Sequence, residues 1–420
     1  MRSYPAAVLG AGVSGEGVCE LLKSLDWDYR VYDEQGRVFD QEEACSCSIV
    51  ISSPGFHSKH PWKLLAQRYG KRVLSEVDFS GYFIKSKIIG ITGTNGKTSV
   101  TSFLTHLWKA IGRNAMSAGN IGYPLSRSVI NEKTNSTIFL EISSFQAEDM
   151  ASIKLESLLW TNIDTDHIDY HGSMEKYFRA KANLMRFTES NKIFVGQCVV
   201  DYAKEINFKL PKEINVVSNK IDFLDNNEDS NFFTTQPQRL NLSLIRAFLK
   251  KQNVNSRELA GALRSYFPEP HRLQRLEIIN DVTFWDDSKA TNFASAIAAC
   301  RNFKGNVLWI GGGKNKGGCI EELAQKIKPL IKKAFLIGES GKVLGKIFKR
   351  IGMPYSLCNS LEHAVKQAFL EASAMSNILL SPGFSSFDTF KNYQERGNLF
   401  QKFVSEIRAF HNLNITHKIA

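Results

Sequence analysis

Short apolar runs alternate along this chain with segments in which apolar residues recur every three or four positions. The opening segment, residues 6–32, starts with an apolar run, turns at a group of glycines, continues with Leu21, Leu22 and Leu25 at helical spacing and ends in a second apolar run. An uninterrupted apolar run predicts a buried strand, and the 3.6-residue period predicts an amphipathic helix. With a further buried strand expected at 49–56, this part predicts a small α/β domain.

The central part of the chain repeats the strand–helix order. A strand at 87–92 leads through a second glycine-rich turn into a helix whose apolar face carries Leu104, Leu107, Trp108 and Ile111. Further strands are predicted at 136–143, 155–163 and 192–197. The polar stretch 222–238 predicts a loop or short hairpin, and helices are expected at 242–251 and 257–266.

Two prolines, Pro268 and Pro270, mark a linker, because proline ends the helix before it and stiffens the chain. Beyond the linker, strands are expected at 282–287, 306–312, 334–338 and 377–383, alternating with helices at 292–300, 321–331 and 361–374. Strands alternating with helices predict mostly parallel sheets. We therefore expect three consecutive α/β domains over residues 1–86, 87–269 and 270–420, the first and last Rossmann-like and the central one of the P-loop type, consistent with the length of 420 residues.

Composition narrows the class of protein. Hydrophobic residues make up 43% and charged residues 23%, which excludes a disordered or collagen-like chain. The net charge of +11 favours anionic partners, although a basic surface alone also explains it. Seven cysteines without a CxxC pair favour reduced thiols, and no secretion signal or apolar run of about 18 residues is present. We expect a cytoplasmic protein that does not insert into a membrane.

The first glycine-rich turn, GAGVSG at 10–15, follows a strand and opens a helix, and Asp33 lies at the end of the next strand. Glycines let the backbone approach a pyrophosphate at the helix N-terminus, where N–H groups favour anions. The motif predicts a dinucleotide or other nucleotide-diphosphate site, and it does not distinguish the two. A tight strand–helix turn without a ligand is the alternative.

The second turn, GTNGKT at 93–98, resembles a Walker A loop, although a strict Walker A has glycine where this chain has Ile91. Backbone N–H groups of such a loop surround phosphates, Lys97 can reach the β- and γ-phosphates, and the Thr98 hydroxyl can bind Mg²⁺. The strand before it and the amphipathic helix after it are the required context. A turn with a solvated lysine is the weaker interpretation.

Acidic and histidine side chains follow the next strands. Glu141 ends an apolar strand and is a natural Mg²⁺ ligand beside a P-loop, or a helix-capping residue before Ser143. His167 lies among Asp164, Asp166 and Asp169, with His171 close behind, and can ligate a metal or be structural. Both interpretations of each residue stay open at this point.

Further polar groups follow the predicted strands of the C-terminal part. His271 and Arg272 come directly after the linker, and the segments at 286–292, 311–317 and 381–387 each follow a strand. Arginine and lysine there can neutralise phosphates, whereas capping is the alternative for Asp287 and Ser288. Because ligands of parallel sheets bind at the carboxyl ends of strands, these motifs predict one shared site.

The order of these motifs is similar to that of the bacterial Mur ligases. The resemblance rests on GTNGKT, LEISSFQ, TNIDTDHIDYH, YFRAK, PHRLQRLE, DDSKATN, GGKNKG and LLSPGFSSFDTFKNYQERG, and it covers the chain from about residue 10 to residue 397. GNIGYP at 119–124 and SFDTFKNYQERG at 386–397 point to the member of the family that adds D-glutamate.

The resemblance implies a reaction and its substrates. ATP phosphorylates the carboxylate of UDP-N-acetylmuramoyl-L-alanine, the amine of D-glutamate attacks the acyl phosphate, and a tetrahedral intermediate gives the amide, ADP and phosphate. The implied setting is peptidoglycan precursor synthesis, with ATP and two Mg²⁺ ions as cofactors. We expect a monomer that takes small-molecule substrates and no nucleic acid.

The resemblance also implies a role for each site residue. The first domain would bind the UDP substrate, the second ATP, and the third D-glutamate. Lys97, Glu141, His167 and a carbamylated Lys181 would be catalytic. The implied ATP site comprises Gly93, Thr94, Asn95, Gly96, Lys97, Thr98, Asn241, Arg272 and Asp287. The implied metal ligands are Thr98, Glu141, His167 and Lys181. The implied UDP-substrate site comprises Val13, Ser14, Asp33, Ser53 and Asn120, and the implied D-glutamate site Lys289, Thr291, Lys316, Ser386 and Tyr393.

This chain departs from the family pattern at four places. The Asp-Thr-Arg expected beside the uracil reads Asp-Glu-Gln at 33–35, and of the adenine-side HNxxN only Asn241 is kept. Asn315 replaces an aspartate in GGxDKG, and Tyr170 replaces an arginine in DHxDRH. None of these changes removes a proposed phosphate, metal or D-glutamate ligand.

Three other functions compete with this prediction. A folylpolyglutamate-type ligase would lack the GAGVSG domain. A nicotinamide-dependent dehydrogenase would use GAGVSG and Asp33 but would leave residues 93–98 unexplained. A P-loop ATPase that binds nucleic acid would fit the charge, but no aromatic–basic recognition module is present.

Overall fold

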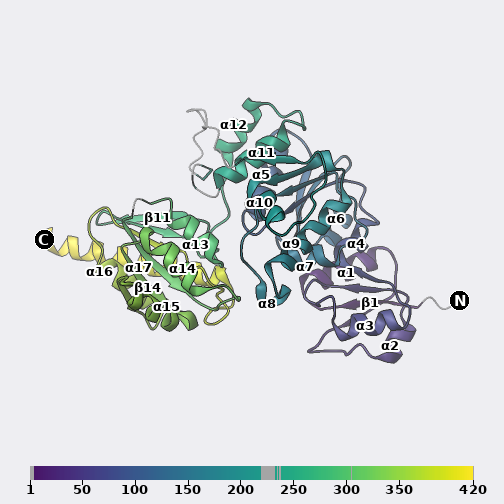
Figure 1. Cartoon of the computed structure of the whole chain (residues 1–420), viewed down its shortest axis with the longest axis horizontal. Coiled ribbons are helices and arrows are strands. Elements are labelled where there is room, and N and C mark those ends of the chain that lie inside the picture. Colours follow the sequence, from purple (N-terminus) through teal and green to yellow (C-terminus); the bar gives the residue numbers. More distant parts are fainter. Residues whose placement is uncertain (1–3, 219–231, 234, 236–237, 304, 420) are drawn as a thin grey trace. The chain divides into compact units, whose positions relative to one another are not determined.

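Three separate β-sheets, each covered by helices, make up the chain in the computed structural model (Figure 1). The structure describes residues 4–218, 232–233, 235, 238–303 and 305–419. Two compact units are present. The first contains residues 1–163, 175–233 and 238–266, and the second contains 164–174, 234–237 and 267–420. Among the described residues, no helix has the length and apolar character that crossing a membrane requires.

The N-terminal sheet has the strand order β2-β1-β3-β4, and all of its strands are parallel. Its strands are β1 (Ala6–Leu9), β2 (Tyr29–Tyr32), β3 (Val50–Ser52) and β4 (Val73–Ser75), and its helices are α1 (Val13–Ser24), α2 (Gln41–Ser46), α3 (Pro61–Arg68) and α4 (Glu76–Gly81). Alternate residues of β1 face opposite layers: Ala7 and Leu9 pack with α2 and α3, whereas Ala6 and Val8 pack with α1 and α4. Both faces of this sheet are therefore buried.

The central sheet has the order β10-β9-β8-β5-β7-β6, also parallel throughout. Its strands are β5 (Lys87–Thr92), β6 (Ala115–Gly119), β7 (Thr137–Glu141), β8 (Ser157–Trp160), β9 (Ile193–Gly196) and β10 (Asn215–Val217). Its helices are α5 (Lys97–Ala110), α6 (Leu125–Ile130), α7 (Ser144–Asp149), α9 (Met174–Ala182), α10 (Gln197–Glu205), α11 (Gln238–Leu249) and α12 (Ser256–Ser265), with 3₁₀ turns at Asn183–Phe187 and Ser190–Lys192. Helices α5, α11 and α12 pack on one core with β5, β7, β8 and β9.

The C-terminal sheet has the order β11-β12-β16-β13-β14-β15, in which only the β11–β12 pair is antiparallel. Its strands are β11 (Gln274–Ile279), β12 (Val282–Asp286), β13 (Val307–Gly312), β14 (Lys333–Ile337), β15 (Tyr355–Leu357) and β16 (Asn377–Leu380). The helices of its unit are α8 (Ile168–His171), α13 (Phe293–Cys300), α14 (Ile320–Ile327), α15 (Gly338–Ile351), α16 (Leu361–Leu370) and α17 (Tyr393–Ile419), with a 3₁₀ turn at Lys328–Leu330. Helices α16 and α17 cover one face, and α13, α14 and α15 cover the other.

The predicted α/β class with mostly parallel sheets is confirmed, as are the predicted strands within four residues at their ends. Two helices were predicted too long. Helix α14 ends at Ile327 because Pro329 lacks the N–H that would continue it, and a 3₁₀ turn follows. Helix α16 ends at Leu370 rather than 374. The loop or hairpin predicted at 222–238 lies largely outside the described residues.

Candidate active site

The P-loop joins β5 to α5 at the carboxyl edge of the central sheet. Gly93 has a φ of +144° and Gly96 a φ of +85°, which are backbone conformations that residues with a Cβ rarely adopt. Gly96 is also the N-cap residue of α5. Because glycine has no side chain to cap the helix, the first backbone N–H groups of α5 have no side-chain acceptor at the N-cap. A 14-residue helix that begins at a glycine loop is suited to bind phosphate.

Two distant side chains hold this loop in shape. Asn162, which follows the neighbouring strand β8, accepts the Asn95 N–H on its Oδ1 at 2.9 Å and donates from Nδ2 to the Asn95 carbonyl at 3.0 Å. Its own carbonyl accepts the Thr94 N–H at 3.1 Å. On the other side, Asn241 of α11 is buried, and a Cβ built on Gly96 would lie 2.5 Å from its Nδ2. The loop is thus preformed, and Asn241 lies against it.

Two lysines point into the same turn. The Nζ of Lys97 donates to the Gly93 carbonyl at 3.0 Å and to the Thr94 carbonyl at 2.8 Å. The Nζ of Lys181, on α9, donates to the same Gly93 carbonyl at 2.9 Å and lies 4.7 Å from the centroid of the Tyr177 ring. Lys181 is only 1% exposed, so two cations converge on the first residue of the loop. Such a concentration of positive charge favours an anionic ligand.

Glu141 ends β7, the strand beside β5, and is 2% exposed. Its Oε1 accepts from Nδ2 of Asn120 at 2.9 Å, and its Oε2 is buried without a hydrogen-bond partner among the described residues. Ser143, not Glu141, caps the following helix, so the capping interpretation of Glu141 is wrong. A buried carboxylate oxygen without a donor is a suitable ligand for Mg²⁺, which is commonly held by one or two carboxylates and substrate phosphates.

The N-terminal glycine loop forms a second tight turn. A Cβ on Gly15 would lie 1.8 Å from the Gly10 carbonyl oxygen, so the helix and strand approach more closely than any other residue allows. Asp33 accepts the Ala11 N–H at 3.0 Å and the Gln35 N–H at 3.2 Å, and these backbone hydrogen bonds lower the pKa of its carboxyl group. Ser53 lies against Gly10, with a buried hydroxyl that has no partner in the described part of the chain. Asp33 and Ser53 therefore both line this loop.

In the second unit, polar groups meet where β12 and β16 end. Asp287 accepts from the Ser381 hydroxyl at 2.7 Å and from the Leu273 N–H at 3.0 Å, and burial raises its pKa to about 7 against the opposing charge of Arg272. The preceding residue, Asp286, is fully buried, and its Oδ2 lies 2.7 Å from Nδ1 of His271. The capping alternative for Asp287 is therefore wrong, since its carboxylate joins two loops instead.

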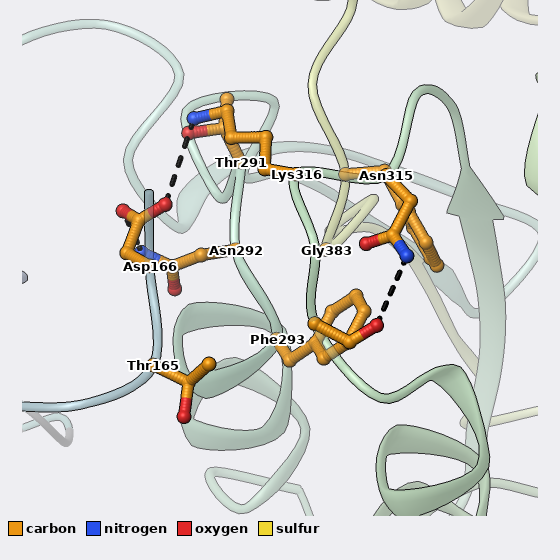
Figure 2. A pocket seen from close by; sticks show the side chains of 10 residues that line it. Thr165, Asp166, Thr291, Asn292, Phe293, Asn315, Lys316 and Gly383 are labelled. Atoms are coloured by element: carbon orange, nitrogen blue, oxygen red, sulfur yellow. Dashed lines mark hydrogen bonds and ion pairs between the residues drawn. The ribbon is translucent and has the colours of Figure 1, made fainter. Parts of the chain in front are cut away.

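A small pocket in the same unit is lined by residues of four segments, among them Thr165, Asp166, Thr291, Asn292 and Lys316 (Figure 2). Asp166 connects three of these segments, because its Oδ2 accepts from Asn292 Nδ2 at 3.1 Å and its Oδ1 lies 3.8 Å from the Nζ of Lys316. Asn292 also caps α13 through its Oδ1. A lysine and an amide thus lie at one carboxylate, and two threonines complete the polar part of the lining.

Comparisons with known proteins place these features in a family. Residues 91–257 match the model of the Mur ligase middle domain, and residues 271–384 match that of the Mur ligase, glutamate ligase domain. A UDP-N-acetylmuramoylalanine--D-glutamate ligase of Prochlorococcus marinus is 31% identical over 95% of this chain and 96% of its own length. One of Thermoanaerobacter pseudethanolicus is 29% identical over 97% and 99%. This chain belongs to the Mur ligase family.

Solved structures agree with this fold at lower identity. The MurF ligase of Thermotoga maritima in complex with ADP is 16% identical, with a TM-score of 0.59, and covers 97% of this chain and 96% of its own. The UDP-N-acetylmuramate-alanine ligase MurC of Thermotoga maritima has the same TM-score at 14% identity over 96% and 99%. As a Mur ligase, the chain is an ATP-dependent enzyme.

The structure of this Mur ligase brings some predicted site residues together. Around the P-loop it groups Lys97, Lys181 and Asn241, and Asn120 joins Glu141. In the second unit, Thr291 and Lys316 share the pocket, and the Nζ of Lys289 lies 3.8 Å from the centroid of the Tyr393 ring. Arg272 counteracts the rise in the pKa of Asp287.

Other predicted site residues are not brought together in this way. Val13 and Ser14 form the first turn of α1, and Val13 is exposed. Ser386 is buried after β16 and is not among the lining residues of the pocket. His167 belongs to the second unit and Lys181 to the first, so their shared metal stays a prediction. Within the described ranges, no three His, Cys, Asp or Glu side chains gather around one point.

Two residues that organise the site are not identified by the sequence motifs. Asn162 belongs to the segment TNIDTDHIDYH, where its position directly after a buried strand beside the P-loop strand is the signal that marks it. Arg396 belongs to the segment SFDTFKNYQERG and is completely buried. A single arginine in the first turn of a helix gives no local sign that it will be buried.

Proposed function

We propose that this Mur ligase joins D-glutamate to UDP-N-acetylmuramoyl-L-alanine, with release of ADP and phosphate, in peptidoglycan precursor synthesis. The observation that carries the proposal is similarity over nearly the whole length to relatives that bear the name of this activity. A P-loop with converging lysines supports it, as does a pocket in the second unit that is lined by Lys316 and Thr291, since the reaction needs a phosphate site and a site for an amino acid with two carboxylates.

The first step is phosphoryl transfer. A carboxylate oxygen of the alanyl group attacks the γ-phosphorus of ATP, the bond to the β,γ-bridging oxygen breaks, and ADP leaves an acyl phosphate behind. We propose that Gly93, Thr94, Asn95, Gly96 and Thr98 form the phosphate site. The N–H groups at the start of α5 would face the phosphates, while those of Thr94 and Asn95 stay bonded to Asn162. Lys97 would exchange its hydrogen bonds to two loop carbonyls for bonds to phosphate oxygens. Asn241, Arg272 and Asp287 would contact the rest of the nucleotide.

Magnesium fits the residues around the P-loop. Glu141 and the Thr98 hydroxyl would hold one ion, and the unpartnered Oε2 of Glu141 is the oxygen best suited to it. His167 and Lys181 would hold a second, with Lys181 carbamylated and the hydrogen bond of its ammonium to the Gly93 carbonyl given up. Bound magnesium would neutralise charge on the phosphates during transfer.

The second step forms the amide bond. The neutral amine of D-glutamate attacks the acyl carbon, the resulting tetrahedral intermediate loses phosphate as the C–O bond breaks, and the amine loses a proton. We propose that Lys289, Thr291, Lys316, Ser386 and Tyr393 hold D-glutamate, with the lysines opposite its two carboxylates. Val13, Ser14, Asp33, Ser53 and Asn120 would hold the UDP part of the first substrate.

The test is release of ADP by the full chain with magnesium, ATP and defined substrates. We expect turnover only when UDP-N-acetylmuramoyl-L-alanine and D-glutamate are both present. L-Glutamate, D-alanine and a folate with L-glutamate serve as control substrates. Equal turnover with L-glutamate, or none with the muramoyl substrate, would contradict the proposed function.

A further inference from the structure

Arg396 lies in the first turn of α17, three residues after Tyr393, and its side chain is fully buried. It is one of the largest side chains in the described part of the chain with almost no exposed surface. Arginine is seldom buried completely, because removal of a charge from water is costly. Arg396 also lies close in sequence to Ser386 and Tyr393, which are proposed to hold D-glutamate, and its burial there suggests that it contributes to the same site.

The guanidinium group makes three hydrogen bonds to two loops. Its Nη2 donates to the Ser288 carbonyl at 2.8 Å, its Nε donates to the Ser288 hydroxyl at 3.0 Å, and its Nη1 donates to the Phe384 carbonyl at 3.3 Å. The Ser288 hydroxyl in turn donates to the Tyr393 carbonyl at 2.8 Å. One side chain thus joins the loop after β12, the loop after β16 and the start of α17.

These three segments carry most of the residues proposed to hold D-glutamate. Lys289 and Thr291 follow Ser288 in the first loop, Ser386 follows Phe384 in the second, and Tyr393 begins the helix. Because β12 and β16 are adjacent parallel strands, with Asp286 opposite Leu380, both loops leave the same sheet edge. The fork of the guanidinium spans the gap between them, which a lysine could not do with the same geometry.

The charge of Arg396 is not cancelled by an ion pair. In the described ranges no carboxylate lies within ion-pair distance of its guanidinium group, although Asp388, Asp286 and Asp287 act on it electrostatically. Burial lowers the pKa of Arg396 to about 10, so it stays a cation at neutral pH. A buried cation with little solvent screening contributes a lasting positive potential to its surroundings.

We propose that Arg396 is the positioning residue of the D-glutamate site. It sets the relative placement of Lys289, Ser386 and Tyr393 and adds positive potential for a dicarboxylate, without touching the substrate itself. This inference rests on the proposed function. Phosphoryl transfer to the first substrate should not depend on Arg396.

The test compares Arg396→Gln with Arg408→Gln in the full chain. Arg408 lies on the same helix, is exposed and pairs with Glu277, so its variant loses the same charge without touching the loops. We expect Arg396→Gln to raise the KM for D-glutamate about 10- to 100-fold, while the KM values for ATP and the muramoyl substrate stay within twofold. Arg408→Gln should leave all three KM values unchanged.

A second measurement separates positioning from folding. Acyl phosphate formed without D-glutamate, trapped by borohydride reduction, should be as abundant in Arg396→Gln as in the unaltered enzyme. If Arg396→Gln does not fold, Ser288→Ala replaces it, with an expected three- to tenfold rise in the same KM. Equal changes in all three KM values, or a KM for D-glutamate within twofold, would overturn the inference. Loss of D-glutamate-dependent turnover in the unaltered enzyme would instead overturn the proposed function.

Discussion

The Nζ of Lys63 lies 2.6 Å from Oδ2 of Asp149, which joins α3 of the N-terminal sheet to the end of α7 of the central sheet. The Lys63 side chain is 6% exposed, and its Nζ also reaches the Phe56 carbonyl at 3.5 Å. Helix α7 follows the strand that ends at Glu141. This ion pair therefore connects the helices of the N-terminal sheet with those of the central sheet.

Removal of one partner of this pair should destabilise the enzyme. Lys63→Met leaves the partly exposed carboxylate of Asp149 without its counter-charge, and the expected loss is about 2 kcal/mol in the free energy of unfolding, measured in urea. The double variant Lys63→Met with Asp149→Leu should recover most of that loss, because no charge is left unpaired. A single variant as stable as the parent would show that the pair is solvated.

Replacement of Lys97 should stop catalysis without unfolding the protein. Lys97→Ala removes the ammonium expected at the ATP phosphates, and we expect ADP release to fall by about 10³-fold or more. Two hydrogen bonds of its Nζ are to carbonyls of the loop itself, so the melting temperature should change little. Lys109→Ala, at the exposed far end of the same helix, is the control. Near-normal turnover of Lys97→Ala would refute the phosphate role.

Glu141→Gln should reveal the cost of the unpartnered carboxylate oxygen. Without magnesium, the neutral amide avoids a buried charge, so the variant should be as stable as the parent or more stable. In the presence of a non-hydrolysable ATP analogue, addition of magnesium should raise the melting temperature of the parent more than that of the variant. The two proteins are compared by thermal unfolding with and without the ion. A similar gain for both would exclude Glu141 as a ligand.

Asp287 should make stability depend on pH. Its pKa is raised to about 7 in the folded chain, so the folded state holds a proton that the unfolded state releases above about pH 4. The contribution of Asp287 to stability should therefore decline as pH rises from about 4 to about 7 and then level off. Asp287→Asn has no carboxyl group to titrate at this position. As pH rises from about 4 to about 7, the melting temperature of the variant should therefore increase relative to that of the parent. A constant difference from pH 5 to 8 would contradict the raised pKa.

Much of the fold could be predicted because its signals are local. The spacing of Leu104, Leu107 and Trp108 places one face of α5 in the core, where the structure has it. The antiparallel strand β11 was not predicted, because it turns at Asn280 and Asp281, both with positive φ, and alternates only weakly. The burial of Gln274–Ile279 is mixed, as expected for a strand at the edge of its sheet.

The sequence by itself determined the α/β order of elements, the two glycine turns and the residues at the strand ends, since each depends on neighbours in the chain. Only the tertiary structure decided which distant groups support them. Asn162 holds the P-loop from 67 residues away, and Arg396 reaches Ser288 across 108. Hydrogen bonds of this kind depend on strands that become neighbours only when the sheet forms, and no local pattern encodes them.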